Sequence, residues 1–395
     1  MKLTLRQQLT QFAHVLQSSL FPVLEEEVGP LGERAKQLVA TLEMIPLARF
    51  IPSSKGWIGR PSKDRYAVAC AFVAKAVYGF TTTAQLLERL AQDAQLRQIC
   101  GWNLARQVPR EWTFSRAFAE FAQMQLPQFV HETLIRETQK DRLIGHIARD
   151  STAIEARERF PEAEQPKAAT VVASGGGKKR GSKKGPRGRN KRWRGGKPVA
   201  TPKDDTRLRR QRTMGLPEML KELPQDCSIG VKTSSKGHQQ YWRGYKLHLD
   251  VADGQIPISA LLTGAKVHDS QAAIPLATMS TQRVTYCYEL MDSAYDAQEI
   301  HEHMHGMGHV AIVDPCKRGR KSKSVTIPLG KPERQLTWAE ADRYKERTMI
   351  ERVNGRLKDE FGGRSVRVRG AAKVMAHLMF GVLALTVDQM RRLLH

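Results

Sequence analysis

Cysteine is scarce in this chain of 395 residues, and the few present lack the spacing of a cysteine-dependent site. The cysteines are Cys70, Cys100, Cys227, Cys287 and Cys316. Their number is odd and no two form a Cys-x-x-Cys pair, which argues against a disulfide framework and against a zinc ribbon. A reducing, cytoplasmic environment is therefore expected.

Several familiar signals are also missing. We find no apolar run long enough to span a bilayer, and the N-terminal segment, interrupted by Gln, Arg and His, does not resemble a signal peptide. There is no Gly-x-Ser-x-Gly motif to expose a nucleophilic serine. The stretch 175–179 lacks the spacing and strand context of a P-loop. A serine hydrolase and a P-loop nucleotidase are therefore disfavoured.

Acidic residues are few relative to basic ones. The chain has 40 Asp and Glu against 64 Lys and Arg, a formal net charge of +24. A positive field of this size suits a polyanion, so nucleic acid is the expected partner and an anionic membrane surface is less favoured. With 41% hydrophobic residues, a chain of this length can fold into two or three domains.

Residues 1–140 have the pattern of a helical domain. Leucines and Phe12 recur at roughly helical spacing near the N-terminus, and a second helix is predicted for Asp64–Val77. Thr82 or Thr83 can cap a further helix. Trp112-Thr113 precede another, with phenylalanines on one face. We expect a helical N-terminal DNA-binding domain, although a helix-turn-helix is only weakly indicated because most small helical domains share this pattern.

From residue 141 the pattern changes to strands that end at acids. Residues 143–150 read as a strand that ends at Asp150, with Ser151-Thr152 as turn residues. A two-stranded hairpin turns at Asp253-Gly254, and Asp269 or Ser270 can cap the next helix. The strand 284–291 ends at Asp292. Each acid could also be an ordinary turn cap.

Further along, residues 309–313 read as a strand, 338–361 as one helix and 371–394 as a final helix. His301 and His305 lie four residues apart, as metal ligands on a helix can. No third ligand is evident, so a polar helix end is the simpler interpretation.

A basic, glycine-rich stretch interrupts this region at about residues 155–230. Between Lys178 and Lys197 there are eleven Lys and Arg and no acid. Such a segment cannot bury a core and should be disordered when free, and it could lie along a phosphate backbone when DNA is bound. The alternative is a solvated loop with no specific role. The candidate DNA-binding residues in this run are Lys178, Lys179, Arg180, Lys183, Lys184, Arg187, Arg189, Lys191 and Arg192.

One short stretch near the C-terminus joins an acid to cations on a single stripe. Tyr344, Arg347, Glu351 and Lys358 are three, four and seven residues apart. If the stretch is one helix, these steps place all four side chains within an arc of about 60°. An acid flanked by cations and a phenol suits cleavage of a phosphodiester. The alternative is a surface helix with ordinary ion pairs.

The three acids could work as a set. Asp150, Asp292 and Glu351 can converge over one side of a mixed sheet, where they would repel one another unless cations lay between them. Mg²⁺ and Mn²⁺ prefer oxygen ligands. Two such ions about 4 Å apart can activate a water and stabilise the leaving oxygen of a phosphodiester.

These residues resemble a known family. Tyr344, Arg347, Glu351 and Lys358 match the Tyr-(2)-Arg-(3)-Glu-(6)-Lys signature of bacterial insertion-sequence transposases, in the group named for insertion sequences four and five of the DDE superfamily. The resemblance covers nearly the whole chain. Residues 60–116 look like that group's helical N-terminal domain, 244–248 and 267–270 like its central hairpin and helix, and 292–296 like its second catalytic block.

The resemblance implies an α/β fold with a ribonuclease H-like mixed-sheet catalytic domain at 141–395, preceded by the all-helical domain at 1–140. It implies that Asp150, Asp292 and Glu351 hold two Mg²⁺ or Mn²⁺ ions. Tyr344, Arg347 and Lys358 would grip phosphates of double-stranded DNA.

The implied substrates are the terminal inverted repeats of the element and target DNA, and the enzyme is expected to act as a homodimer. The chain would cut a strand with water and then join the 3′-hydroxyl to the target. Some members have a large insertion between the second Asp and the Glu, whereas 59 residues separate Asp292 from Glu351 here. Whether the second strand is cut through a hairpin therefore stays open.

Two other functions are compatible with the same residues. The chain could be a transposase-derived DNA-binding protein that is no longer catalytic, or a nuclease that never joins strands. All three acids are present, which favours the active enzyme.

Overall fold

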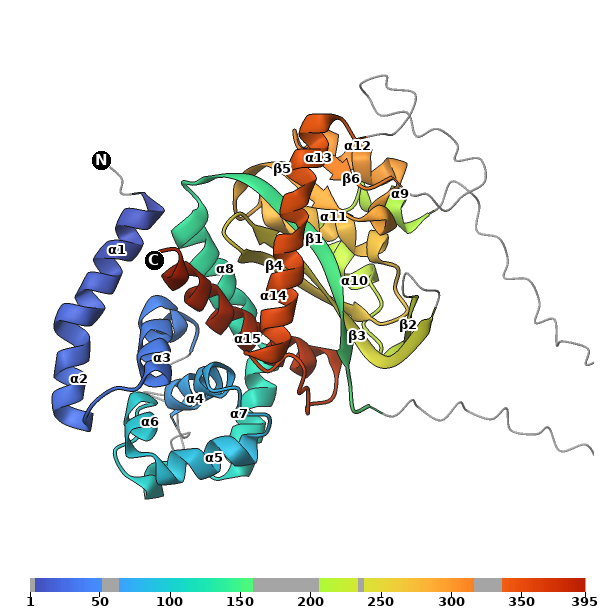
Figure 1. The fold of residues 1–395 in the computed structure, drawn as a ribbon. Helices are drawn as coiled ribbons and strands as arrows, with labels where there is room; N and C mark the ends of the chain where they lie inside the picture. Colours follow the sequence, from blue (N-terminus) through green and yellow to red (C-terminus); the bar gives the residue numbers. More distant parts are fainter. Residues whose placement is uncertain (1–3, 52–63, 159–205, 234–237, 316–335, 395) are drawn as a thin grey trace, which may run out of the picture.

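The structure, a computed structural model, describes residues 4–51, 64–158, 206–233, 238–315 and 336–394 (Figure 1). In the described part before residue 140, every regular element is a helix. These helices are α1 (Leu5–Val15), η1 (Leu16–Leu20), α2 (Phe21–Val28), α3 (Glu33–Met44), η2 (Leu47–Phe50), α4 (Arg65–Val77), α5 (Thr83–Gln92), α6 (Ala94–Ile99), η3 (Ala105–Gln107), α7 (Glu111–Gln123) and α8 (Leu126–Gln139).

Side-chain caps define where two of these helices begin, and one of them, Thr82, was a predicted candidate. The Asp64 carboxylate accepts from the backbone N–H groups of Tyr66 and Ala67 at the start of α4. Thr82 forms a capping box with Gln85 at the start of α5. Such caps satisfy N–H groups that have no partner inside the helix, typically stabilising it by about 1 kcal/mol. Both helix starts were predicted from the sequence, and both are confirmed.

A mixed sheet of six strands forms the other half of the molecule. Its order is β2-β3-β1-β5-β6, and β4 pairs with the remaining length of β3. β1 is antiparallel to β3 and parallel to β5, and β5 is parallel to β6. The strands are β1 (Leu143–Glu155), β2 (Ser228–Thr233), β3 (Gln239–Ala252), β4 (Ile256–Gly264), β5 (Thr285–Met291) and β6 (Val310–Val313). The predicted mixed α/β architecture is confirmed, as are the hairpin of β3 and β4 and the strand that ends before Asp292.

Helices cover both faces of this sheet (Figure 1). On one face, α11 carries Ser280, whose hydroxyl donates to Asp250 of β3 at 2.6 Å. On the other, Ile350 and Val353 of α14 share a core with Leu249 of β3. These helices follow the earlier strands in the chain: α9 (Arg207–Gln211), α10 (Leu216–Glu222), η4 (Asp269–Ala272), α11 (Ala273–Thr281), η5 (Ser293–Tyr295), α12 (Gln298–Gly306), α13 (Trp338–Tyr344), η6 (Lys345–Arg347), α14 (Thr348–Asp359) and α15 (Ala371–Arg392).

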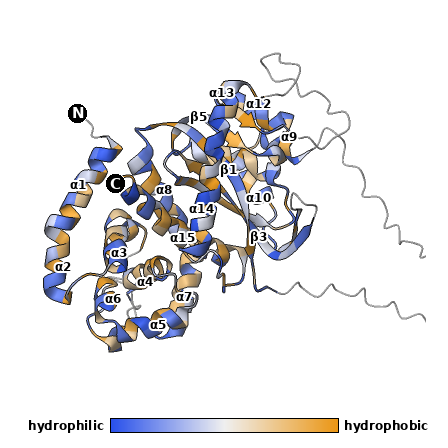
Figure 2. Ribbon diagram, viewed as in Figure 1, coloured by the Kyte–Doolittle hydropathy of each residue, from blue (hydrophilic) through white to orange (hydrophobic). Residues whose placement is uncertain are grey.

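The final helix, α15, runs through the centre of the molecule. It contacts α3, α4, α7 and α8 as well as β4, and apolar residues recur along its length (Figure 2). The Gln37 amide donates to the Asp388 carboxylate at 2.8 Å, which links α3 to α15. By length and composition this helix could cross a membrane, contrary to the expectation from the sequence, but 72% of its apolar stretch is buried inside the protein. It is the core helix that joins the helical half to the sheet.

Two predicted boundaries near the sheet are wrong. β1 does not end at Asp150, because Ser151-Thr152 pair with His248 and Leu247 of β3 and the strand continues to Glu155. The predicted interruption at 155–230 is too long. Residues 206–233 form α9, α10 and β2, where Met219 and Leu223 are buried.

Two predicted helix features also differ from the structure. The expected single helix at 338–361 is divided into α13, η6 and α14, because a tighter 3₁₀ turn occupies Lys345–Arg347. A 3₁₀ turn has 3.0 residues per turn, so it rotates the stripe that the sequence pattern implied. Neither Asp269 nor Ser270 caps the helix after β4. His268 caps η4, and Asp269 instead pairs with Lys246.

Candidate active site

Two of the three predicted catalytic acids lie side by side on neighbouring strands. In the parallel register of β1 and β5, Arg149 pairs with Met291. Asp150 and Asp292 each follow these residues directly in the chain. Neighbouring strands lie about 4.8 Å apart, so Asp150 and Asp292 are adjacent across the two strands. Asp292 accepts a hydrogen bond from the backbone N–H of Ala294 at 3.0 Å, which fixes its orientation at the end of β5.

Both carboxyl groups favour the protonated form more than an exposed aspartate does. Burial raises the pKa of Asp150 to about 6, and the nearby charge of Asp292 adds to the rise. Burial also raises the pKa of Asp292, with a further rise from Asp269. Arg347 lowers the pKa of both acids. A pair of partly buried carboxylates of this kind is stabilised by added positive charge.

Arg347 lies among the three acids. Its Nη2 donates to Glu351 Oε1 at 2.6 Å, and its guanidinium lies over the Tyr344 ring at 5.8 Å. Burial lowers the pKa of Arg347, but Tyr344 and the charges of Asp150, Glu351 and Asp292 together raise it. The guanidinium therefore provides the positive charge that the acids share.

Glu351 is the most open of the three acids, with a side chain 55% exposed on α14. In the described ranges, no group of three or more His, Cys, Asp or Glu side chains is arranged to hold a metal ion. The structure therefore brings Asp150 and Asp292 together, and Arg347, which binds Glu351, lies close enough for its charge to act on both aspartates. All three donate carboxylate oxygens, the ligand type that Mg²⁺ and Mn²⁺ prefer, so the donor set fits such ions in kind.

The other predicted contacts are distributed differently. Tyr344 is half-buried beside the acids, and burial raises the pKa of its hydroxyl to about 12, which keeps it protonated. Lys358 lies seven residues after Glu351 on α14, about 10 Å further along the axis. Burial and the charges of Arg364 and Lys232 lower its pKa. The nine predicted residues of the basic run, Lys178 to Arg192, lie outside the described residues.

Comparison with known proteins identifies the family. Residues 142–387, well over half of the chain, match the family described as "Transposase DDE domain". The chain belongs to the DDE transposase family. Residues 25–120 match a second family, described as "Transposase domain (DUF772)". Searches of curated proteins and of solved structures found no significant match. Membership of this family implies that the protein acts on DNA.

The transposase contains a buried ionic cluster beneath Asp150 that sequence reasoning missed. The Arg149 guanidinium donates to both oxygens of Asp250 on β3, at 2.8 Å each, and to Glu289 on β5 at 2.6 Å. Glu289 also accepts from the Tyr286 hydroxyl at 2.9 Å and contacts His309 Nδ1 at 3.1 Å. Arg149, Asp250 and Glu289 are fully buried. Arg149 thus joins the strand of Asp150 to the strands on both sides of it.

The sequence held one signal for this cluster. Glu289 is an acid within the largely apolar strand 285–291, whereas Asp250 alternates with apolar residues and falls on the polar half of its strand. Charged residues are almost never fully buried unless they are paired, so Glu289 was the residue whose position indicated a buried cation. Arg149, which directly precedes Asp150 in the chain, is the cation that the structure places there.

Asp269, which the sequence suggested as a helix cap, lies beside the candidate site instead. The Lys246 ammonium donates to its Oδ1 at 2.9 Å and to the Val267 carbonyl at the same distance. Burial would raise the pKa of Asp269, but His248 and Lys246 lower it overall, so this acid stays ionised. Its charge raises the pKa values of Asp150 and Asp292. The ion pair with Lys246 therefore keeps Asp269 negatively charged beside Asp150 and Asp292.

The raised pKa of Asp150 predicts how stability depends on pH. An acid whose folded pKa lies above its unfolded value of 3.8 binds a proton more tightly in the folded protein. The stability it provides is present at low pH and disappears as the pH rises through about 4 to 6. In EDTA at pH 7, Asp150→Asn should therefore raise the melting temperature by at least about 2 °C, and the gain should shrink towards pH 4.

Differential scanning fluorimetry across this pH range measures the effect. Asp253→Asn is the matched control, since this acid lies outside the pair and binds His146. A loss of stability in Asp150→Asn at pH 7 would contradict the assigned environment.

Proposed function

We propose that this chain is an active transposase of the group named for insertion sequences four and five. It would bind the terminal inverted repeats of its element, cleave a strand, and join the 3′-hydroxyl to target DNA. The observation that carries the proposal is the adjacency of Asp150 and Asp292, with Arg347 connecting them to Glu351. A ribonuclease H-like arrangement at 141–395, preceded by a DNA-binding domain at 1–140, is the corresponding domain proposal.

The proposed chemistry assigns each residue a task. Asp150, Asp292 and Glu351 would hold two Mg²⁺ or Mn²⁺ ions. When bound, such ions activate a water and stabilise charge on the phosphate oxygens. Asp292 is held by the Ala294 N–H, and the strand of Asp150 is held by the Arg149 cluster, so both carboxylates keep fixed directions. The two carboxylates would then need to move little when metal ions and DNA bind.

Arg347 and Tyr344 would contact the phosphate that enters the site. A guanidinium can hold two phosphate oxygens at once, which an ammonium cannot. Arg347 binds Glu351 in the structure. When metal ions neutralise the acids, it would release Glu351 and bind a DNA phosphate instead. Lys358, about two turns further along α14, would contact a neighbouring phosphate of the same strand. These residues fit the Tyr-Arg-Glu-Lys signature as DNA contacts.

The proposed partners follow from the same assignment. The net charge of +24 suits double-stranded DNA, and pairing of two element ends suits a homodimer in the DNA complex. The proposed location is the bacterial cytoplasm, in association with the nucleoid.

A strand-transfer assay tests the proposal. Labelled duplexes with the inverted repeats that flank the gene are incubated with the full chain, Mg²⁺ and a supercoiled target. A transposase yields cut ends and label joined to the target. A nuclease yields only cut ends, and an inactive descendant binds the ends without cutting, so either of these results would contradict the proposal.

Deleting Lys178–Lys197 should weaken DNA binding with little change in sequence preference. Phosphate contacts position a protein, whereas base contacts specify the sequence. The slope of log affinity against log salt should become shallower by about 0.9 for each duplex phosphate that the protein no longer neutralises. Fluorescence anisotropy at several salt concentrations measures this, with specific and unrelated duplexes compared. An unchanged slope would mean that the run binds no phosphate.

A further inference from the structure

A cationic cavity lies away from the acids. It has a volume of about 400 Å³ and lies between α4, α5, α7, α15 and the loop that follows α14. Its lining includes five cations and, among the residues described, no Asp or Glu. The cations are Lys75, Arg157, Arg367, Arg369 and Lys373. A site with this lining selects an anion.

Lys75 is the residue that most needs an anionic partner. It is only 8% exposed, and its ammonium forms no ion pair or hydrogen bond with any part of the chain that the structure describes. Burial lowers its pKa to about 8. The neighbouring His377 is partly buried, and burial lowers its pKa to about 4, so it is neutral; its Nε2 donates to the Gly362 carbonyl at 3.0 Å and provides no charge to balance the lysine. The ammonium is not fully enclosed and borders the cavity, so an anionic ligand there would offset the cost of a charge set this deep without a partner.

Part of the remaining wall of the cavity is aromatic, with five phenylalanines among its lining residues. Phe72 lies 4.8 Å from Phe118 and 5.8 Å from Phe380, measured between ring centroids, and Phe361 lines the same space. Aromatic faces stack on nucleobases of any sequence. The volume falls within the range of about 300–1,000 Å³ that small organic ligands occupy. Cations beside an aromatic wall match a nucleotide, which has a phosphate at one end and a flat base at the other.

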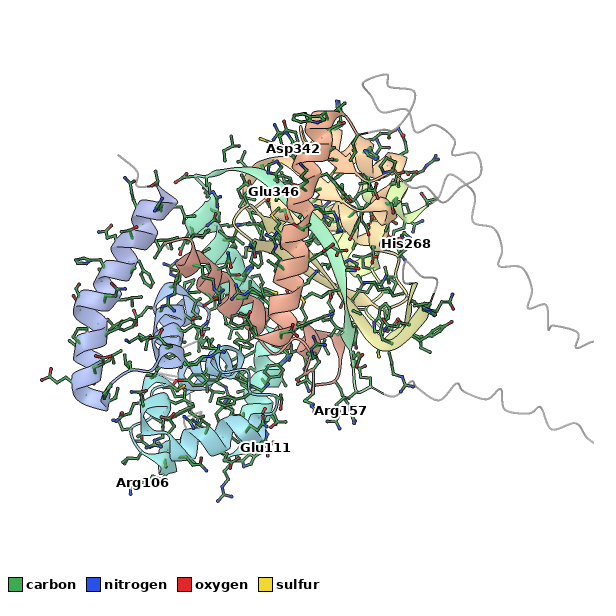
Figure 3. All side chains as sticks on the ribbon, viewed as in Figure 1. Arg106, Glu111, Arg157, His268, Asp342 and Glu346 are labelled. Carbon is green, nitrogen blue, oxygen red and sulfur yellow. The ribbon has the colours of Figure 1, made fainter. Side chains whose placement is uncertain are left out.

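Two elements lead from the acids to this cavity. Arg157 lies seven residues after Asp150, just beyond the end of β1, and seven residues of extended chain span about 23 Å. Phe361 lies ten residues after Glu351, just beyond the end of α14, a distance of about 15 Å at the rise of a helix. Figure 3 shows Glu346 near the start of α14 and Arg157 beyond its other end. At a rise of about 3.4 Å per base pair, this separation is on the order of five nucleotides.

We propose that this cavity binds one unpaired nucleotide of the DNA strand, with its phosphate at Lys75 and its base against the phenylalanine wall. The inference rests on the proposed function, because it places the nucleotide on the strand that enters the acid site. The base must be unpaired, since a duplex cannot enter a cavity of this size. The pocket would therefore hold a strand end or a distorted position of the element's terminus.

Photocrosslinking tests the proposal. A short oligothymidylate that carries 5-iodouracil is bound to the full chain in EDTA, irradiated, and the adduct is mapped by mass spectrometry. Adducts are expected on peptides that contain Phe72, Phe118 or Phe361. Thymidine monophosphate should compete better than inorganic phosphate. If the two compete equally, the cavity is a phosphate site only and the base assignment is wrong.

Substitutions give the second readout. Lys75→Met and, on the exposed loop, Arg367→Gln should each weaken oligothymidylate binding about tenfold, the loss expected for one charge-assisted hydrogen bond. Arg106→Gln, an exposed cation outside the pocket (Figure 3), should stay within twofold of wild type. If Lys75→Met does not fold, Arg367→Gln and the crosslink decide.

The outcomes separate this inference from the proposed function. Adducts elsewhere and unchanged binding in both variants, in a protein that still cleaves element ends, would overturn only the nucleotide pocket. A protein that forms the expected adduct but never cleaves would overturn only the proposed function. Glu351→Gln should keep the crosslink, because the pocket does not include this acid.

Discussion

Glu351→Gln is expected to lower the rate of DNA cleavage by at least about a hundredfold while leaving DNA binding close to that of wild type. Even groups that only support metal ligands cost 10- to 100-fold when removed, so loss of a direct carboxylate ligand should cost at least as much. Glutamine keeps the size of the side chain. The ion pair with Arg347 that this change removes is half exposed at Glu351, so the fold should change in stability by less than about 1 kcal/mol.

Glu346→Gln is the matched control. This exposed acid lies in η6, close to Glu351 in the chain, and is visible near the junction of α13 and α14 in Figure 3. Cleavage of labelled element ends in Mg²⁺ and anisotropy of the same DNA in EDTA are measured for both variants. Cleavage by Glu351→Gln within a few-fold of wild type would remove this residue from the site.

Arg149→Met should have the largest effect on stability, a loss of about 3–5 kcal/mol in the free energy of unfolding. The substitution leaves Asp250 and Glu289 as buried, uncompensated charges, the situation in which breaking a buried pair is strongly destabilising. Arg89→Met is the control, because the Arg89 side chain is half exposed, so its pair with Asp93 at the end of α5 should contribute less than about 1 kcal/mol.

Urea denaturation followed by circular dichroism measures both variants. Combining Arg149→Met with Asp250→Leu and Glu289→Gln should recover part of the loss, because fewer unpaired charges remain buried. Equal stabilities of Arg149→Met and Arg89→Met would show that the cluster does not hold β1 in place.

The parts of the fold that were predictable are those that local patterns determine. The start of α4 at Asp64, the cap Thr82, the Asp253-Gly254 turn and the end of β5 at Asp292 each depend on residues within a few positions of one another. The order of strands and acids was readable for the same reason. Asp292 was therefore placed correctly as an acid at the end of a strand.

The features that were missed depend on partners far away in the chain. The length of β1 is set by its pairing with β3, so the sequence around Ser151 looked like a turn. Asp250 and Glu289 lie 101 and 140 residues from Arg149, a separation at which no local spacing is informative. The break at Lys345–Arg347 contains neither Pro nor Gly, so nothing in the sequence marked it.

The candidate site combines both kinds of information. The three acids and their flanking cations were proposed from the sequence, and the registry that places Asp150 beside Asp292 came only from the sheet. The role of Asp269 as a permanently ionised neighbour held by Lys246 also required the structure, since the two lie on different elements.

Binding of Mn²⁺, followed by electron paramagnetic resonance in the full chain with bound DNA, tests the central claim most directly. Two Mn²⁺ ions per chain are expected for wild type and for Glu346→Gln, with binding weakened at least about tenfold in Asp150→Asn, Asp292→Asn and Glu351→Gln. Binding in these three variants equal to that of wild type would contradict the account, because the ions would then be held by other residues.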